Sequence, residues 1–598
     1  MSATRSGQRP GIPDPPQAAG GAAPGSGDRL PGYQDPGGQD ASRREPAHQA
    51  GDSTWATRRG GLRGRWSLLL ALIAGLTLTG AFPPFGFWPL AMVGPALFAL
   101  AIWRKGIWST AGLALLTGLA FYVPLLSWLL NVAWYAWAAL AVVEALIFAA
   151  LALALPALLR LRLWPITLAG WWVAQEGLHS RAPFGGFPWG RLVMSQAGAP
   201  TAGWAAIGGL PWLTFMLALA GGCVAWLVIV TASTRPATAA PRAHTIRAVR
   251  AFAPIPAIPV AVAITFIGLT LAGDLVWHVP APASAAPARG TGSGTGSGTA
   301  LVAAIQGDVP HARNLPGLLR ATTVTANHAA ATRWLAAQVK AGRVPAPQLV
   351  IWPENSTDID PAYYPPTYQL IANAVAAIDR PVLVGAVLDY PRRNAGQLWL
   401  PGVGPVQVYL KRQLVPFGEV IPFRSFLLHF TSLPNLQPVN FTPGHKAVVF
   451  HVGQIRLGDV ICYEIGFDNL VRSEVLAGAN LLAVQTNDAT FEVDGQLGES
   501  LQQLAMTRMQ AVATGRAIVV ASTTGVSSFV EPDGSVLIHS GTWQRAVLEA
   551  RVPLVTTLTP ADRLGQWPEL ALITGTVLAL AWSLLRPMTR RRSIRSAP

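Results

Sequence analysis

The stretch IRLGDVICYEIGF, residues 455–467, decides the fold class of this chain. It begins as a short apolar run of the kind that forms a buried β-strand, and polar groups follow where that strand would end. Cys462 stands at this end, with Tyr463 and Glu464 directly after it. A cysteine here is either a small packed core residue or a nucleophile. The rest of the sequence has to decide between the two.

Similar short runs alternate with helical segments between about residues 300 and 556. This alternation predicts an α/β layered domain with buried strands. The expected helices are about 322–341, 365–378, 468–478 and 498–514, and the expected strands, besides the one above, are ALVAAIQG, LVIWPE, PVLVGAV, VQVYLK, LLAVQTND and AIVVAST.

The remainder of the chain has the composition of an integral membrane protein. Charged residues make up 12% of the 598 residues, the mean hydropathy is +0.37, and there are 22 tryptophans. Soluble domains carry about 25% charged residues, and indoles collect at membrane interfaces. The other cysteine, Cys223, lies in the apolar run GGCVAWLVIV and is expected to be a packing residue. Two cysteines cannot build a disulfide framework.

Eight apolar segments have about the length that a bilayer core requires, which is about 17–25 residues. Seven of them precede the α/β stretch and one follows it, and the fifth is the shortest. They cover about 66–82, 86–103, 107–130, 134–159, 163–178, 206–231, 253–276 and 568–586.

The net charge of +15 is explained by clusters of arginine and lysine between these segments rather than by a nucleic-acid partner. The clusters precede the first segment and follow the second, fourth, sixth and eighth. By the positive-inside rule, both termini are cytoplasmic and the α/β stretch lies outside the cytoplasmic membrane. The clusters are Arg58, Arg59, Arg63 and Arg65; Arg104 and Lys105; Arg160 and Arg162; Arg235, Arg242, Arg247 and Arg250; and Arg586, Arg590, Arg591, Arg592 and Arg595.

Composition also divides the chain into five parts. The first is rich in Pro, Gly, Ala and Ser and is expected to be a disordered cytoplasmic tail. A Gly/Ser/Thr linker precedes the α/β domain. The predicted parts are a tail (1–60), a seven-span membrane domain (61–280), a linker (281–299), the α/β domain (300–556), and a last transmembrane helix with a basic cytoplasmic tail (557–598).

Three strand ends in the α/β domain carry groups that could act together. Glu354 ends LVIWPE, Lys411 ends VQVYLK, and Cys462 ends IRLGDVIC. A carboxylate can accept the thiol proton, and an ammonium group offsets the resulting repulsion between two negative charges. The ammonium group and the backbone N–H groups after the cysteine could also stabilise an oxyanion. Each residue alone has a more ordinary interpretation, as a loop, surface or core residue; together they predict a base, a stabiliser and a nucleophile for acyl transfer.

The motifs WPE, LVPFGE and CYE, in this order, resemble the carbon–nitrogen hydrolase (nitrilase) superfamily with its Glu-Lys-Cys triad. The form LVPFGE with ICYEIGF, the membrane spans, and the stretches FPPFGFWPL (82–90) and GGFPWG (185–190) resemble one branch, the apolipoprotein N-acyltransferases. The resemblance implies an αββα sandwich outside the membrane, joined to a helical bundle of about eight spans. It implies that Glu419 supports Lys411 and the intermediate, and that Tyr463 and Glu464 shape the site.

The resemblance also implies the reaction and its partners. Cys462 would take an acyl chain from a membrane phospholipid as a thioester and pass it to the α-amine of a diacylglyceryl apolipoprotein. No cofactor, metal or nucleic acid is expected, and the protein is expected to be a monomer in the bacterial cytoplasmic membrane. A membrane-anchored amidase or nitrilase is the alternative enzyme, and a ligand-binding transporter is the alternative without catalysis.

Three positions depart from the family pattern. The helix before AIVVAST has Gln510 and Ala513 in the usual Arg and Glu places, and Thr490 stands in the Trp place of an NDAWFG-like stretch. These changes bear on the support of the site and on the fit of the substrate, and they leave open a specialised paralogue or a slow enzyme. The outer loop with Arg181, Trp189 and Arg191 is expected to meet lipid headgroups or to act as an interfacial anchor.

Overall fold

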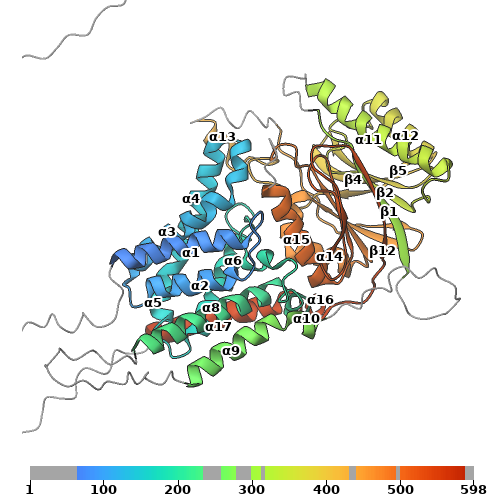
Figure 1. The fold of residues 1–598 in the computed structure, drawn as a ribbon. Coiled ribbons are helices and arrows are strands. Elements are labelled where there is room, and N and C mark those ends of the chain that lie inside the picture. Colours follow the sequence, from blue (N-terminus) through green and yellow to red (C-terminus); the bar gives the residue numbers. More distant parts are fainter. Residues whose placement is uncertain are drawn as a thin grey trace, which may run out of the picture. The chain divides into compact units, whose positions relative to one another are not determined.

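The computed structural model describes residues 64–233, 257–277, 298–310, 317–429, 439–492 and 498–585. The predicted tail (1–60), most of the predicted linker (281–299) and several of the basic clusters lie outside the described residues. Within these ranges the chain forms a helical bundle and an α/β domain with two sheets (Figure 1), so the predicted fold class is confirmed.

All eight apolar segments contain helices. Among the described residues, five helices are long and apolar enough to cross a membrane, and the others are shorter, so the count of eight spans stays a prediction. The helices of this part are α1 (Gly64–Ala81), α2 (Leu90–Ile102), α3 (Ile107–Leu125), α4 (Trp134–Leu151), α5 (Leu155–Leu158), α6 (Trp164–His179), α7 (Trp204–Gly208), α8 (Leu210–Ser233), α9 (Ala257–Leu271), α10 (Gly273–Val276) and α17 (Trp567–Leu585).

Small residues and buried hydroxyl groups hold the bundle together. Gly75 of α1 lies so close to α3 that a Cβ there would meet the carbonyl oxygen of Thr117 at 2.4 Å. The Thr117 hydroxyl in turn donates to the carbonyl of Ala71 at 3.0 Å. Apolar helices in lipid associate through such close packing, because lipid tails compete for purely hydrophobic contact.

The α/β domain consists of two six-stranded sheets with the strand orders β12-β1-β2-β3-β4-β5 and β11-β10-β9-β8-β7-β6. The strands β1–β3 run parallel, as do β7–β9. The strands are β1 (Thr299–Gln306), β2 (Leu349–Ile351), β3 (Val382–Leu388), β4 (Arg393–Leu400), β5 (Gly404–Leu410), β6 (Val449–Val452), β7 (Ile455–Ile461), β8 (Leu481–Thr486), β9 (Ile518–Ser522), β10 (Ser528–Val530), β11 (Val536–His539) and β12 (Ala546–Pro553).

The two sheets face one another across an apolar core, in which Val302 and Leu383 of one sheet join Leu457 and Val519 of the other. Helices cover the outer faces. The helices α11 (Gly317–Lys340) and α12 (Pro365–Ile378) pack on the first sheet. The helices α14 (Asp468–Leu476) and α15 (Gly498–Thr514) pack on the second, and two short helices, α13 (Arg424–Leu427) and α16 (Pro560–Leu564), lie in the connections. This is the predicted αββα sandwich.

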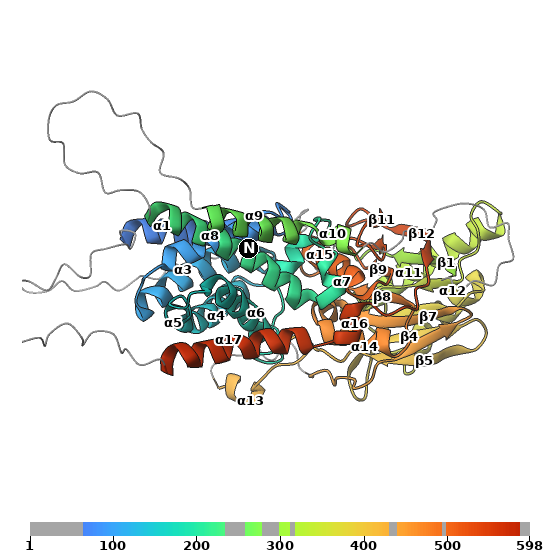
Figure 2. The same cartoon turned by 90° about the horizontal axis from the view of Figure 1, so that it is seen from below.

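The second sheet faces the bundle through α14 and α15. Their apolar side chains, such as Val475 and Met509, belong to one continuous buried core with the helices of the bundle. Figure 2 shows α14, α15 and α16 between the bundle and the sheets, with α17 running along the bundle from that junction. The bundle therefore supports the same half of the sandwich that carries Cys462.

Candidate active site

Glu354 lies just after β2, in a turn that packs directly on β3. Gly385 makes this approach possible, because a Cβ there would lie 2.1 Å from the Pro353 carbonyl oxygen and 2.8 Å from the Glu354 Cα. The carboxyl group is buried, with 5% of the residue exposed. Its Oε2 accepts a hydrogen bond from the Asn487 backbone N–H at 3.1 Å.

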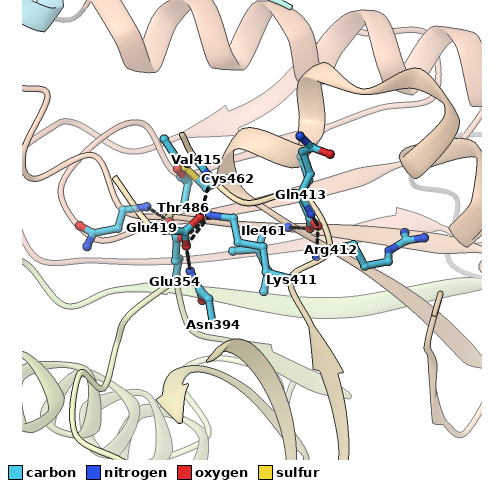
Figure 3. A network of polar contacts seen from close by, with 12 residues as sticks. Glu354, Asn394, Lys411, Arg412, Gln413, Val415, Glu419, Ile461, Cys462 and Thr486 are labelled. Atoms are coloured by element: carbon cyan, nitrogen blue, oxygen red, sulfur yellow. Dashed lines mark hydrogen bonds and ion pairs between the residues drawn. The ribbon is translucent and has the colours of Figure 1, made fainter. Parts of the chain in front are cut away.

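Lys411 follows β5 and is 1% exposed. Its Nζ donates to Oε1 of Glu354 at 2.9 Å and to Oε1 of Glu419 at 3.1 Å (Figure 3). Burial lowers the pKa of Lys411, but the two carboxylates raise it by more, so that it stands well above its ordinary value. The side chain therefore carries its positive charge at neutral pH, which a buried ammonium group does only when it is paired.

Asn394 completes this group, and the sequence analysis missed it. It stands at the start of β4, paired with β5, and its Nδ2 donates to Glu354 at 2.7 Å and to Glu419 at 2.8 Å. The Val415 backbone N–H donates to the other oxygen of Glu419 at 2.8 Å. We call Glu354, Asn394, Lys411 and Glu419 the carboxylate–lysine cluster. The glycine-containing turn between two apolar runs at 401–404 could have revealed this hairpin.

Cys462 lies directly after β7, next to the carboxylate–lysine cluster (Figure 3). Its φ of 53° is in the left-handed region, which costs a non-glycine residue of order 1–3 kcal/mol. The residue opens a short 3₁₀ helix, Cys462–Gly466, so a sharp turn presents the sulfur at the strand end. The Nε2 of Gln503 on α15 donates to Sγ at 3.7 Å. Gln503 was also missed, because glutamine on an amphipathic helix is usually a surface residue.

The electrostatics of the site keep the thiol protonated at rest. Burial raises the pKa of Cys462 well above its ordinary value, the Glu354 carboxylate raises it further, and Lys411 lowers it. Burial also raises the pKa of Glu354, with Lys411 opposing and Glu419 adding to this shift. A carboxylate with a raised pKa is a better proton acceptor near neutral pH than an ordinary glutamate. The arrangement therefore suits proton transfer from sulfur to Glu354 during attack on a substrate.

After burial, Glu354 and Lys411, the charges of two further carboxyl groups, Glu499 and Asp488, also affect the thiol and raise its pKa. Asp488 accepts hydrogen bonds from the hydroxyl groups of Thr486 (2.8 Å), Ser522 (2.7 Å) and Ser500 (3.1 Å). Burial raises the pKa of Asp488, and it raises that of Glu499 well above its usual value. Within the described ranges no group of three or more His, Cys, Asp or Glu side chains could hold a metal ion.

Comparison with known proteins identifies the family. The family model for the apolipoprotein N-acyltransferase N-terminal domain matches residues 74–223, and the carbon–nitrogen hydrolase model matches residues 301–559. An apolipoprotein N-acyltransferase of Mycolicibacterium smegmatis is 36% identical over 92% of this chain and 93% of its own length. This chain belongs to the apolipoprotein N-acyltransferase family. A relative of the same description from Azotobacter vinelandii is 30% identical over 91% of this chain and 98% of its own length.

Solved structures of the nitrilase superfamily resemble less than half of this chain. One is a mutant of an amidase from Nesterenkonia AN1, which is 15% identical, covers 44% of this chain and 93% of its own, and has a TM-score of 0.33. The family membership makes this chain an acyltransferase, and the resemblance stated from the motifs is confirmed.

Tyr463 and Glu464 both belong to the turn that holds the sulfur, and neither hydrogen-bonds to the carboxylate–lysine cluster. Glu464 accepts from the backbone N–H groups of Arg412 (2.6 Å) and Ile461 (2.8 Å), which ties the chain after Lys411 to the strand before Cys462. Tyr463 faces the outer loop of the bundle. Its ring stacks on Trp189 with the centroids 5.6 Å apart, and its hydroxyl donates to the Gly186 carbonyl.

The outer loop of the bundle also pairs with the start of α14. Arg191 is 6% exposed and makes two hydrogen bonds with the Asp468 carboxylate, at 2.7 and 2.8 Å. Asp468 is the first residue of α14, just after the turn that holds the sulfur. Gln510, in the usual Arg place, donates to the Ile465 carbonyl at 3.0 Å and to Asp468 at 3.3 Å. The cation that pairs with Asp468 therefore comes from the bundle, and α15 adds a neutral hydrogen bond through Gln510.

The other two departures differ in their surroundings. Ala513 is buried, and its carbonyl accepts from the Thr559 hydroxyl at 2.8 Å. Thr490 is exposed in the loop after β8. Nothing in the structure explains why threonine stands there.

Proposed function

We propose that this chain transfers an acyl chain from a membrane phospholipid to the α-amine of a diacylglyceryl-cysteine at the N-terminus of an apolipoprotein. The observation that carries the proposal is the buried carboxylate–lysine cluster beside Cys462, in a domain packed on apolar helices. Curated relatives across nearly the whole chain bear the name of this activity. They favour it over the amidase alternative.

The first half-reaction forms a thioester. Glu354 accepts the Cys462 proton while the sulfur attacks the carbonyl carbon of a phospholipid acyl ester, and the oxyanion forms beside the Lys411 ammonium group. The carbon–oxygen bond of the ester then breaks. Protonated Glu354 returns its proton to the departing oxygen, so a lysophospholipid leaves and the acyl chain stays on sulfur.

The second half-reaction uses Glu354 and Cys462 again, with the sulfur now as the leaving group. The neutral α-amine of the apolipoprotein attacks the thioester carbonyl, and Glu354 accepts a proton from the amine nitrogen. The carbon–sulfur bond breaks, and the thiolate recovers the proton from Glu354. The products are an amide-linked acyl chain on the lipoprotein and the free thiol, so no atom is left over and no cofactor is consumed.

The contacts that α15 and the loop after β8 make with the bundle support a lipid substrate. The amide of Gln502, beside Gln503, donates to the Leu125 carbonyl at 3.0 Å and accepts from Trp128 Nε1 at 3.2 Å. Asn131 donates to the Phe491 carbonyl at 2.7 Å. A sulfur held this close to membrane helices suits substrates that arrive within the bilayer, and a site shielded from water favours transfer over hydrolysis.

The placement in the cell is part of the proposal. The α/β domain would lie on the extracytoplasmic side of the bacterial cytoplasmic membrane, with both termini in the cytoplasm, as the basic clusters indicate. The protein would work as a monomer, and its five parts would be divided as the sequence predicts, at 60, 280, 299 and 556.

Intact-protein mass spectrometry of the purified chain mixed with phospholipid tests the proposal. The expected result is the added mass of one acyl chain, which maps to Cys462 and is absent in Cys462→Ala. The Cys223→Ala variant is the matched control, since it removes the other, buried cysteine and should still be acylated. If the wild-type chain carries no adduct and yields no N-acylated lipopeptide, the proposal is wrong.

A further inference from the structure

A separate cavity of about 370 Å³ lies where the bundle meets the α/β domain. Residues at the ends of α6, α8 and α17 form one wall, including Gly177, Leu210 and Glu569. Gly466 and residues of α14, α15 and α16 form the other. None of Glu354, Lys411 and Cys462 lines it. The cavity is therefore distinct from the candidate active site, although it begins directly behind the turn that holds the sulfur.

Two ion pairs at the cavity satisfy most of its charges internally. Arg181 donates to both oxygens of Glu569, at 2.7 and 2.6 Å, and so joins the end of α6 to the start of α17. Arg191 pairs in the same way with Asp468. These two arginines have no need of a ligand to balance their charge.

Arg472 on α14 has no such paired hydrogen bonds with a carboxylate, although its charge interacts with the Asp562 carboxylate, whose pKa burial raises and Arg472 lowers. Its Nε donates to the Asp562 carbonyl at 2.7 Å, which fixes the plane of the guanidinium group. One face of the group lies against Gly565, where a Cβ would come within 2.9 Å of the Arg472 Cζ. Among the described residues neither Nη atom has a hydrogen-bond partner, although Arg472 lines the cavity. The two Nη groups of Arg472 are therefore hydrogen-bond donors that border the cavity.

The cavity also lies at the ends of apolar helices. Gly177 is in the last turn of α6, Leu210 begins α8, and Glu569 is in the first turn of α17. Trp567, at the start of α17, is 73% exposed, as is typical of a tryptophan at the membrane interface. Figure 2 shows α16 and α14 at this end of α17. In the membrane placement proposed above, the ends of α8 and α17 lie at the level of the lipid headgroups.

We propose that this cavity binds the phosphate group of a membrane phospholipid through the two Nη groups of Arg472. A guanidinium group with two free donors matches two oxygens of a phosphate in geometry and charge. We assign this lipid a role separate from that of the acyl donor, because none of Glu354, Lys411 and Cys462 lines the cavity. It would instead fill the junction between the bundle and α14. The inference rests on the membrane placement of the proposed function and not on its chemistry.

Native mass spectrometry of the full chain with phosphatidylethanolamine and phosphatidylglycerol in detergent tests this inference. The Cys462→Ala background prevents acyl transfer, so the result does not depend on the proposed reaction. We expect Arg472→Ala to bind one phospholipid fewer, or to bind it about tenfold more weakly. Arg563→Ala is the matched control, since it removes an exposed arginine of the adjacent helix that does not line the cavity.

A second variant and a soluble ligand make the result decisive. Asn469→Trp fills the cavity from an exposed position of α14 and should lose the same phospholipid while Arg472 remains. Millimolar inorganic phosphate distinguishes the source of the ligand. If phosphate protects the chain from thermal unfolding through Arg472 and lipid does not bind there, the ligand is a soluble phosphate. If neither phosphate nor phospholipid depends on Arg472, the inference is wrong.

Discussion

Replacing Asn394 by leucine tests the carboxylate–lysine cluster at its least expected member. The side chain donates to both carboxylates, at 2.7 and 2.8 Å, and leucine removes both hydrogen bonds while keeping the branching at Cγ. Lys411 stays in place to hold Glu354 and Glu419. The variant should therefore fold, with the two carboxylates less firmly oriented and Glu354 harder to ionise.

The expected size of the effect follows from the charge on the acceptors. A hydrogen bond to a charged group contributes ~1.5–3 kcal/mol. If one of the two Asn394 bonds is needed in the transition state, thioester formation slows by about 10- to 150-fold at neutral pH, since 1.36 kcal/mol is a factor of ten. Loss of a donor to the ionised form also raises the pKa of Glu354.

The assay is a time course of acyl addition to Cys462, followed by intact-protein mass spectrometry over a range of pH. Gln407→Leu is the matched control, because it removes one hydrogen bond of β5, from Gln407 to the Val449 carbonyl, without touching the cluster. An Asn394→Leu variant that acylates at the wild-type rate, with an unchanged pH profile, would refute the role given to this side chain.

Three further predictions concern the active site and its contact with the bundle. The rate of thioester formation should fall as the pH is lowered from neutral, because Glu354 accepts the proton only when ionised and its pKa is raised; Glu354→Gln should leave only a low rate without this dependence. Gln503→Leu should slow alkylation of the thiol by iodoacetamide several-fold, since Sγ loses the N–H donor 3.7 Å away, and equal rates would exclude that role. Arg191→Met should destabilise the chain by about 1.5–3 kcal/mol in thermal unfolding, because Asp468, which is 28% exposed, loses two charge-assisted hydrogen bonds, and the exchanged pair Arg191→Asp with Asp468→Arg should recover part of the loss.

The sequence predicted the parts of the site that stand at strand ends. Glu354, Lys411 and Cys462 each follow a short apolar run, and buried strands of this kind are recognisable from local sequence. The helices 365–378 and 498–514 also agree with α12 and α15 to the residue. For α12 the local pattern was sufficient because the helix buries one apolar face, with Ile371, Ala374, Val375 and Ile378. The helix α15 is buried on nearly all sides and includes buried polar residues such as Gln502 and Gln503, so its pattern did not reveal which side chains reach the site.

The missed elements depend on contacts that are distant or irregular in sequence. The strand β4 begins with arginine and asparagine and contains a glycine, so its apolar pattern is weak, and Asn394 was missed with it. The last strand, β12, pairs with β1 from the far end of the domain. The pairing of Arg191 with Asp468 joins residues 277 positions apart, and no local pattern links them. The strands β6, β10 and β11 were missed as well.

The central claim is that Cys462 carries the acyl chain from one lipid to another, and a chase of the isolated acyl-enzyme tests it most directly. The chain is loaded from a phospholipid with an isotopically labelled acyl group, freed of lipid, and mixed with a diacylated lipopeptide bearing a free α-amine. Mass spectrometry should find the label leaving Cys462 and appearing in amide linkage on the lipopeptide. Release of the label as free fatty acid, at the same rate with and without lipopeptide, would contradict the account and indicate a hydrolase.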